Sequence, residues 1–156
     1  MTDFDGFEDA ADDFGSLADK LRDVAARLPS AVDSGVQRTA MTIQGTAQAN
    51  APVDRGELRQ KIETRRIELA AYQVISAAPH AQAVEFGTDP HVITPNSADA
   101  LAFEGQNGEL IFRKRVEHPG TPAQPYLRPA VRQHQSELTE NINDAINELF
   151  RQVFST

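Results

Sequence analysis

Residues 118–130 read HPGTPAQPYLRPA, and residues 83–88 read AVEFGT. Each stretch carries a glycine where we expect a tight turn, Gly87 in one and Gly120 in the other. The first stretch also holds four prolines within eleven residues, and each proline fixes its own φ angle. Stiff loops lose little conformational entropy on docking. These two segments therefore favour repeated protein–protein contacts over an active site.

Length and composition bound the class of protein. The chain has 156 residues, enough for one domain with a buried core. It contains no cysteine, which excludes a disulfide framework, a thiol nucleophile and a zinc–thiolate site. No apolar run approaches the roughly 18 residues of a membrane span, and the acidic N-terminus is unlike a secretory signal. We expect a soluble protein made in a cytoplasm, with no membrane partner.

The charge is strongly acidic. Asp and Glu number 23 against 15 Lys and Arg, for a net charge of −8. That balance argues against a general nucleic-acid binder, which needs bases to neutralise phosphates. The Asp-rich, Lys-poor composition favours a proteome adapted to high salt, where acids are screened, and an ordinary acidic surface is the alternative. Six acids and no base fall in the first thirteen residues, so we expect residues 1–15 to form a flexible acidic segment.

Apolar spacing predicts helices at both ends of the chain. Leu17, Leu21, Val24 and Leu28 are spaced for a first helix over residues 16–28, which Pro29 should stop. A second helix is expected over residues 30–50. A third and longer one is expected over residues 126–154, where apolar positions recur every three or four residues.

The middle of the chain has the pattern of short strands. Strands are expected over residues 61–69, 72–77, 92–94, 101–103 and 110–116, and a short helix over residues 79–86. The first two strands should pair as a hairpin with a bulge, and Asn107-Gly108 marks a hairpin turn that would bring Phe103 and Phe112 to one buried face. The fold class is therefore α+β: two N-terminal helices, a small antiparallel β-sheet and a long C-terminal helix packed on it. We expect one domain over residues 16–156.

Catalytic patterns are lacking. There is no serine in a nucleophile elbow and no glycine-rich phosphate loop. Loops could bring His80, Glu85, His91 and His118 together around a metal, as in a metallohydrolase, but scattered loop histidines are the reading we favour. His134 falls on an apolar helix stripe, where we expect it to be partly buried. We expect neither an enzyme nor a bound cofactor.

A basic cluster stands out on this acidic chain. Arg113, Lys114 and Arg115 are consecutive, and Arg65-Arg66 lies on an earlier strand. Neighbouring strands would join the two into a positive patch facing DNA in a channel or an acidic surface of a neighbouring subunit. A solvated strand face is the alternative.

Several motifs, in order, resemble one family. They are residues 51–59 (APVDRGELR) after a helix, residues 83–88 (AVEFGT) after a hairpin, residues 93–114, and residues 118–130 before the last helix. Their order and spacing resemble the neck and tail-completion family of long-tailed double-stranded DNA viruses, also called minor tail or head–tail joining proteins. The resemblance covers about residues 30–135. Arg55 stands where such proteins often have Thr, and Tyr126 where they often have Phe.

The resemblance implies a structural virion protein of the neck or tail, assembled in the host cytoplasm. It would form a homo-oligomeric ring of six copies that completes the tail and joins it to the portal side. Its partners would be the connector or stopper and the tail terminator or tail tube, with DNA passing non-specifically through the ring. Family members catalyse nothing and hold no cofactor or metal. The acidic composition would make the host a halophile.

Two segments and the basic cluster are our candidate contact surfaces in such a ring. Their residues are Glu85, Phe86, Gly87, Thr88, Arg113, Lys114, Arg115, Pro119, Gly120, Thr121, Pro122, Pro125, Tyr126 and Leu127. One alternative is that these residues only brace the fold at its chain reversals. Other functions left open are the tail terminator or stopper ring of the same neck, and a small acidic protein-binding module of a cell.

Overall fold

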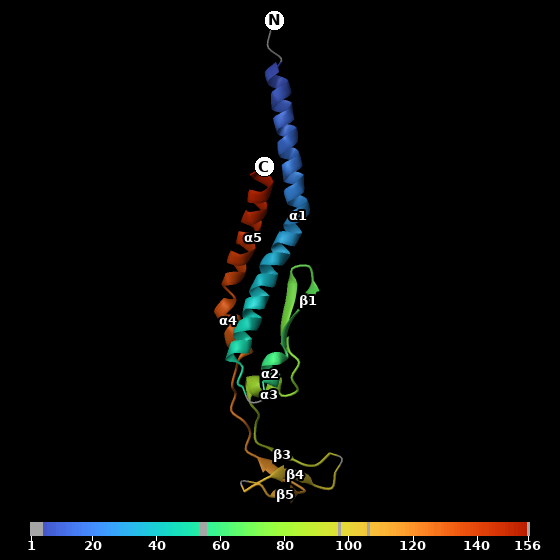
Figure 1. Ribbon diagram of the computed structural model, residues 1–156, viewed down its shortest axis with the longest axis vertical. Coiled ribbons are helices and arrows are strands. Elements are labelled where there is room, and N and C mark those ends of the chain that lie inside the picture. Colours follow the sequence, from blue (N-terminus) through green and yellow to red (C-terminus); the bar gives the residue numbers. More distant parts are fainter. Residues whose placement is uncertain (1–4, 54–55, 97, 106, 156) are drawn as a thin grey trace.

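The molecule is elongated and built along one helix (Figure 1). The structure, a computed structural model, describes residues 5–53, 56–96, 98–105 and 107–155. Its helices are α1 (Asp5–Asn50), α2 (Glu57–Gln60), α3 (Ala81–Phe86), α4 (Leu127–His134) and α5 (Glu137–Phe154). Its strands are β1 (Ile62–Glu68), β2 (Ala71–Ser76), β3 (His91–Ile93), β4 (Leu101–Glu104), β5 (Leu110–Arg113) and β6 (Val116–His118). The predicted α+β class is confirmed.

The helix α1 replaces the two N-terminal helices that were predicted. It runs through Pro29 without ending, so the expected stop is wrong. Proline removes one backbone hydrogen bond and crowds the preceding turn, which bends a helix. Figure 1 shows α1 changing direction part way along its length. The helix continues because its residues on both sides of the proline pack on α5: Val24 clusters with Leu149 and Val153, and Gly35 lies against Ile142.

The first residues of the chain also differ from expectation. The structure places residues 5–15 in α1, where the sequence led us to expect a flexible segment. Residues 1–4 of that segment lie outside the described residues. A helix of 46 residues is about 69 Å long at 1.5 Å per residue, so α1 extends well past the end of α5.

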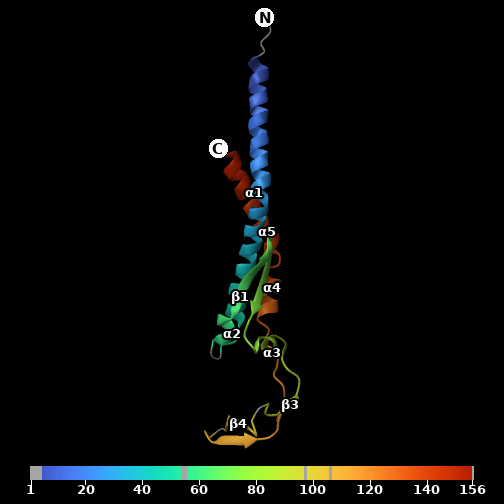
Figure 2. The same ribbon diagram turned by 90° about the vertical axis from the view of Figure 1, so that its right-hand side faces the viewer.

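The predicted C-terminal helix is interrupted, and it packs on α1 instead of on a β-sheet. It divides into α4 and α5, which are separated by Gln135 and Ser136. At the break, His134 is buried as expected, with Nε2 2.8 Å from Thr46 Oγ1 and Nδ1 2.8 Å from Glu137 Oε1. The helix α5 lies along α1 rather than on a sheet, because α1 stands between α5 and the β1–β2 hairpin (Figures 1 and 2).

The β1–β2 hairpin is confirmed, with the predicted irregularity between Arg66 and Glu68. Its turn is attached to α1 through Asp33. One carboxylate oxygen of Asp33 accepts a hydrogen bond from the N–H of Ala70 (2.8 Å), and the other accepts one from the Tyr72 hydroxyl (3.1 Å). The Ala70 hydrogen bond is the main reason that the pKa of Asp33 lies below its ordinary value. The sequence analysis did not predict this contact.

The remaining strands form two further two-stranded sheets, not one sheet with β1–β2. The strand predicted over residues 110–116 is divided, so that β5 pairs with β4 and β6 pairs with β3. In the β4–β5 register, Phe103 stands opposite Ile111 and Phe112 stands opposite Ala102. Successive residues of a strand point to opposite faces, so Phe103 and Phe112 do not share a face and both are exposed. Their predicted common buried face is wrong.

The main core lies where the C-terminal end of α1 meets α2, β1, α3 and the start of α4. Its buried residues are Ala47, Ala51, Leu58, Ile62, Ala78, Ala81, Tyr126 and Ala130. Five of these eight are alanines, which allow backbones to approach closely but bury little apolar surface. The core therefore depends on its two largest fully buried side chains, Tyr126 and Ile62.

Gly35 sets how closely α5 approaches α1. A Cβ built on Gly35 would lie 2.6 Å from the Ile142 Cα, closer than any Cβ contact allows. We expect Gly35→Ala to force the two helices apart and lower the free energy of unfolding by about 1–3 kcal/mol. Urea denaturation measures this change.

Gly45 in the same helix is the matched control, because a Cβ there would meet nothing within 4 Å. Gly45→Ala should raise stability by about 0.5–1 kcal/mol through helix propensity alone. Equal effects of the two substitutions would contradict the close packing at Gly35.

Candidate assembly surfaces

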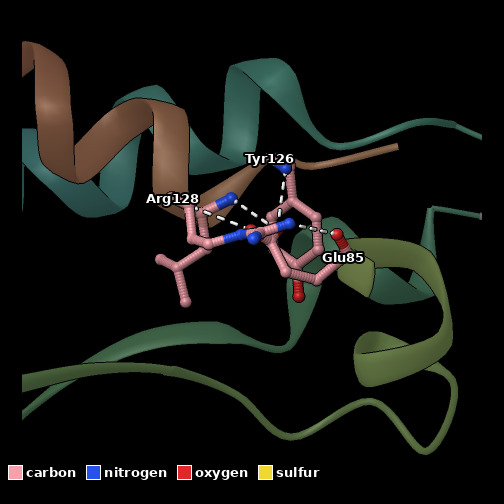
Figure 3. A network of polar contacts seen from close by, with 4 residues as sticks. Glu85, Tyr126 and Arg128 are labelled. Carbon is pink, nitrogen blue, oxygen red and sulfur yellow. Dashed lines mark hydrogen bonds and ion pairs between the residues drawn. The ribbon is translucent and has the colours of Figure 1, made fainter. Parts of the chain in front are cut away.

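A buried carboxylate joins the two segments that the sequence analysis singled out. Glu85, at the end of α3, is only 4% exposed. Its Oε2 accepts hydrogen bonds from the backbone N–H groups of Tyr126 (2.8 Å) and Leu127 (2.9 Å). Its Oε1 accepts two more from Arg128, one from the backbone N–H (3.1 Å) and one from Nε (2.9 Å), as Figure 3 shows. Glu85 thus satisfies the free N–H groups at the start of α4 from a distant part of the chain.

The environment of Glu85 determines its ionisation. Burial alone would raise the pKa of Glu85, because it disfavours a charge. The hydrogen bonds from the N–H groups of Leu127, Tyr126 and Arg128 outweigh burial and hold the pKa below its ordinary value of 4.5. The folded protein therefore stabilises the charged carboxylate.

The turns that follow Glu85 and precede Tyr126 lie against each other. Thr88 and Thr121 exchange two backbone hydrogen bonds of 2.9 and 3.0 Å, so the two segments form a short antiparallel bridge. Gly87 and Gly120 flank this bridge with φ angles of 76° and 86°. A Cβ on Gly87 would lie 2.7 Å from the Thr121 carbonyl oxygen, and a Cβ on Gly120 would overlap the Thr88 oxygen. Glycine is needed at both positions for conformation and for space.

The structure divides the residues of these two segments into inner and outer groups. Glu85 and Tyr126, which is 2% exposed, lie inside the chain and brace it, as in the alternative that such residues hold the fold at its chain reversals. Leu127 is half-buried against the main core. The half-buried residues of the bridge are Gly87, Thr88 and Gly120, and the exposed residues are Phe86, Pro119, Thr121, Pro122 and Pro125.

Phe86 is the most prominent apolar side chain on this surface. It is 60% exposed, although the Arg128 guanidinium lies over its ring at 4.5 Å from the centroid. The same guanidinium donates a hydrogen bond of 3.0 Å to the Glu85 carbonyl oxygen. Arg128 therefore fixes the position of Phe86 while leaving most of the ring available to a neighbour.

The basic residues of the two strands do not join into the single positive patch that the sequence analysis considered. Arg113, Lys114 and Arg115 are exposed at the end of the β4–β5 hairpin. Arg65 and Arg66 lie on β1, a separate sheet beside α1 (Figure 1), so the two groups stay apart. Arg65 and Arg66 are also paired with acids, Glu63 and Asp33.

The histidines do not gather around a common centre. His91 and His118 face each other across the β3–β6 pair, with ring centroids 5.0 Å apart. Within the described ranges, no group of three or more His, Asp or Glu side chains is arranged to hold a metal ion. The part of the chain that the structure describes also contains no helix with the length and apolar character needed to cross a membrane.

Exposed apolar surface is the signal that sequence reasoning missed. The accessible surface is 11357 Å², whereas a compact protein of 17.1 kDa exposes about 7,800 Å². Large apolar side chains are exposed at both ends of the molecule, on the part of α1 beyond α5 and on the β4–β5 hairpin. The helical spacing of Phe14, Leu17 and Leu21 could have revealed the first group if residues 5–15 had been included in the helix.

Comparison with known proteins finds a match over part of the chain. Residues 15–87 match the family model described as "Bacteriophage HK97-gp10, putative tail-component". The matched segment is thus similar to phage tail components, and it spans most of α1 through α3 and ends at Gly87. Neither the curated proteins nor the solved structures contain a match to the chain.

The Glu85 network makes a prediction for stability. Glu85→Gln keeps the shape of the side chain but removes the charge that four donors share. We expect it to lower the free energy of unfolding by about 2–3 kcal/mol near neutral pH. Chemical denaturation of both proteins measures the loss, with Glu140→Gln on the exposed side of α5 as the matched control.

The same network sets a pH dependence. Because the folded pKa of Glu85 is lowered, its contribution is complete above about pH 4.5 and is lost as the pH falls through the folded value. The stability difference between the wild type and Glu85→Gln should therefore shrink below pH 4.5. A difference that stays constant to low pH would contradict this role.

Proposed function

We propose that this chain is a structural tail protein of a long-tailed double-stranded DNA virus. In this proposal it forms a ring at the head–tail interface, which completes the tail and joins it to the connector. The single observation that carries the proposal is the large, partly apolar surface of the isolated chain, about half as large again as that of a compact protein of its mass. Such a surface indicates a protein that functions in an assembly. The similarity of residues 15–87 to phage tail components supports a viral tail as that assembly.

The shape of the chain supports a ring of like copies. Its two ends differ in secondary structure (Figure 1), and the sequence gives one end an excess of acids and the other a run of three bases, so neighbouring copies would join through unlike surfaces. Contacts of that kind close into a ring when the rotation between neighbours closes. We propose six copies, with the connector or stopper on one side, the tail terminator or tail tube on the other, and DNA passing through the opening.

The best-defined polar network supports a structural role. Glu85, Tyr126 and Arg128 fix the start of α4, and the side chain of Glu85 is fully occupied by four donors. A carboxylate that braces two backbone segments in this way has no free lone pair directed at a substrate. We therefore propose that the protein catalyses no reaction and needs no cofactor.

Virion assembly tests the proposed role. A virus that lacks this protein should accumulate filled heads and separate tails, and supplying the protein should restore joined particles. Electron microscopy of the lysates counts the three kinds of particle. Normal numbers of joined, infectious particles without the protein would overturn the proposal.

Salt dependence tests the proposed halophilic host. The chain carries 23 acidic residues against 15 basic ones, and this excess of like charge repels itself when it is unscreened. We expect the midpoint of thermal unfolding of the purified protein to rise steadily from low to molar potassium chloride. A midpoint that does not change with salt would contradict adaptation to high salt.

A further inference from the structure

The β4–β5 hairpin is a two-stranded sheet with two open edges. Among the described residues, its strands pair only with each other. Figures 1 and 2 show the hairpin at the end of the molecule opposite the N-terminus of α1, away from the long helices. A two-stranded sheet is marginally stable by itself, and an open strand edge is a template for pairing with another chain. A further strand on either edge would therefore stabilise the hairpin.

The register of the hairpin shows which backbone groups of β5 face its open edge. The N–H of Gly105 donates a hydrogen bond to the carbonyl oxygen of Glu109 (2.8 Å), so these two residues are bonded across the hairpin. Bonded and non-bonded residue pairs alternate along an antiparallel ladder. The N–H and C=O groups of Leu110 and Phe112 therefore point away from β4. Consistently, the Phe112 carbonyl oxygen accepts a hydrogen bond from Nη1 of Arg113 (3.2 Å).

The strand β5 is self-complementary about Ile111. In an antiparallel pair of β5 strands centred on this residue, Leu110 of each copy lies opposite Phe112 of the other. Both residues have outward backbone groups, so each of these two pairs exchanges two hydrogen bonds. A register shifted by two residues keeps one such pair instead of two, because β5 spans only Leu110–Arg113. The side chains of Leu110 and Phe112, 68% and 59% exposed, cover each other on one face of the joined sheet.

Opposite charges meet on the other face of this pairing. Glu109 and Ile111 share that face, because a Cβ built on Gly105 would meet both of their side chains. Arg113 follows on the same face, two residues after Ile111. In the register centred on Ile111, Glu109 of each copy lies opposite Arg113 of the other. Neither residue makes an ion pair with a described residue of its own chain, and the Glu109 carboxylate, which accepts the Asn107 N–H (3.1 Å), keeps acceptor capacity for a guanidinium.

Other ways of joining two hairpins lack this match. Two-fold pairing through the open edge of β4 would place Glu104 opposite Ala102, with no base opposite an acid. Hairpins that lie side by side and point the same way would gather Glu104 and Glu109 of both copies at one end and Arg113 of both at the other. Like charges at such distances repel each other. Charge and hydrogen-bond geometry together therefore select the pairing of β5 with β5.

We propose that two copies of the free protein pair through their β5 edges, about a two-fold axis at Ile111, and form a four-stranded sheet. The Phe112 carbonyl oxygen then accepts the N–H of Leu110 from the other copy, and the Arg113 guanidinium moves from that oxygen to Glu109 of the other copy. A two-fold contact is complete with two copies, so it does not build the proposed ring. It belongs to the free protein, in which it covers part of the apolar hairpin surface before assembly.

A single cysteine tests the two-fold axis, because the chain has no cysteine of its own. Ile111 lies opposite its own copy in a non-bonded pair, in which the two Cα atoms are about 4.5 Å apart and within reach of a disulfide. Under mild oxidation, Ile111→Cys should form a covalent dimer at least about tenfold faster than Phe103→Cys. Phe103 is opposite Ile111 on β4, one strand farther from the axis. Non-reducing gel electrophoresis measures both rates at equal protein concentration.

The Phe103→Cys control separates the specific contact from chance collisions. Phe103 is exposed, whereas Ile111 is half-buried, so random encounters would cross-link Phe103→Cys at least as fast. Equal rates, or a faster rate for Phe103→Cys, would overturn the β5 contact.

Charge exchange tests the side chains that meet. Arg113→Glu should weaken dimerisation by about three- to thirtyfold, because it places two acids opposite each other twice in every dimer. Glu109→Arg should weaken it similarly, and both substitutions in one chain should restore the wild-type dissociation constant to within about threefold. Sedimentation equilibrium at moderate salt measures the constants. Arg132→Glu, at an exposed base of α4, is the matched control and should leave the constant unchanged.

The dimer and the proposed function fail separately. A purified protein that stays monomeric at all concentrations, or a doubly exchanged chain that associates no better than either single variant, would overturn the dimer. The virion assay counts joined particles and decides the proposed function independently.

Discussion

The fold depends on one carboxylate that bridges distant backbone segments. Glu85 lies at the end of a six-residue helix, and all four of its hydrogen bonds reach residues that follow more than 40 positions later. Between them the chain travels to the β4–β5 hairpin and returns, so this contact and the Thr88–Thr121 bridge close the whole excursion. The start of α4 is fixed at the same point, which directs α5 back along α1.

Local signals in the sequence predicted much of this arrangement. Alternating apolar residues and turn residues located the β1–β2 hairpin and its bulge, and the glycines at 87 and 108 take the positive φ values that their turns require. The segments around Glu85 and Tyr126 were singled out together, and the structure brings them together. The sequence left open whether Tyr126 faces a neighbour or the core, because an aromatic residue after a proline-rich loop looks the same in both cases, and the structure buries it.

Errors arose where tertiary contacts override local preference. Pro29 normally ends a helix, but packing of α1 against α5 on both sides of it preserves the helix. The acidic start of the chain resembles a disordered tail by composition, yet it continues a helix that is already formed. The register of β4 and β5 placed Phe103 and Phe112 on opposite faces, and a shift of one residue, which sequence alone does not fix, would have changed that result.

The pairing of Val24 with Leu149 and Val153 has a consequence for how the chain is made. A ribosome completes α1 long before α5 emerges, so the newly made helix has its apolar stripe open while residues 51–136 are added. Chains that stop early leave that stripe uncovered, which marks them for chaperones and proteases. Only a finished chain acquires the paired helices, so this part of the core forms at the end of synthesis.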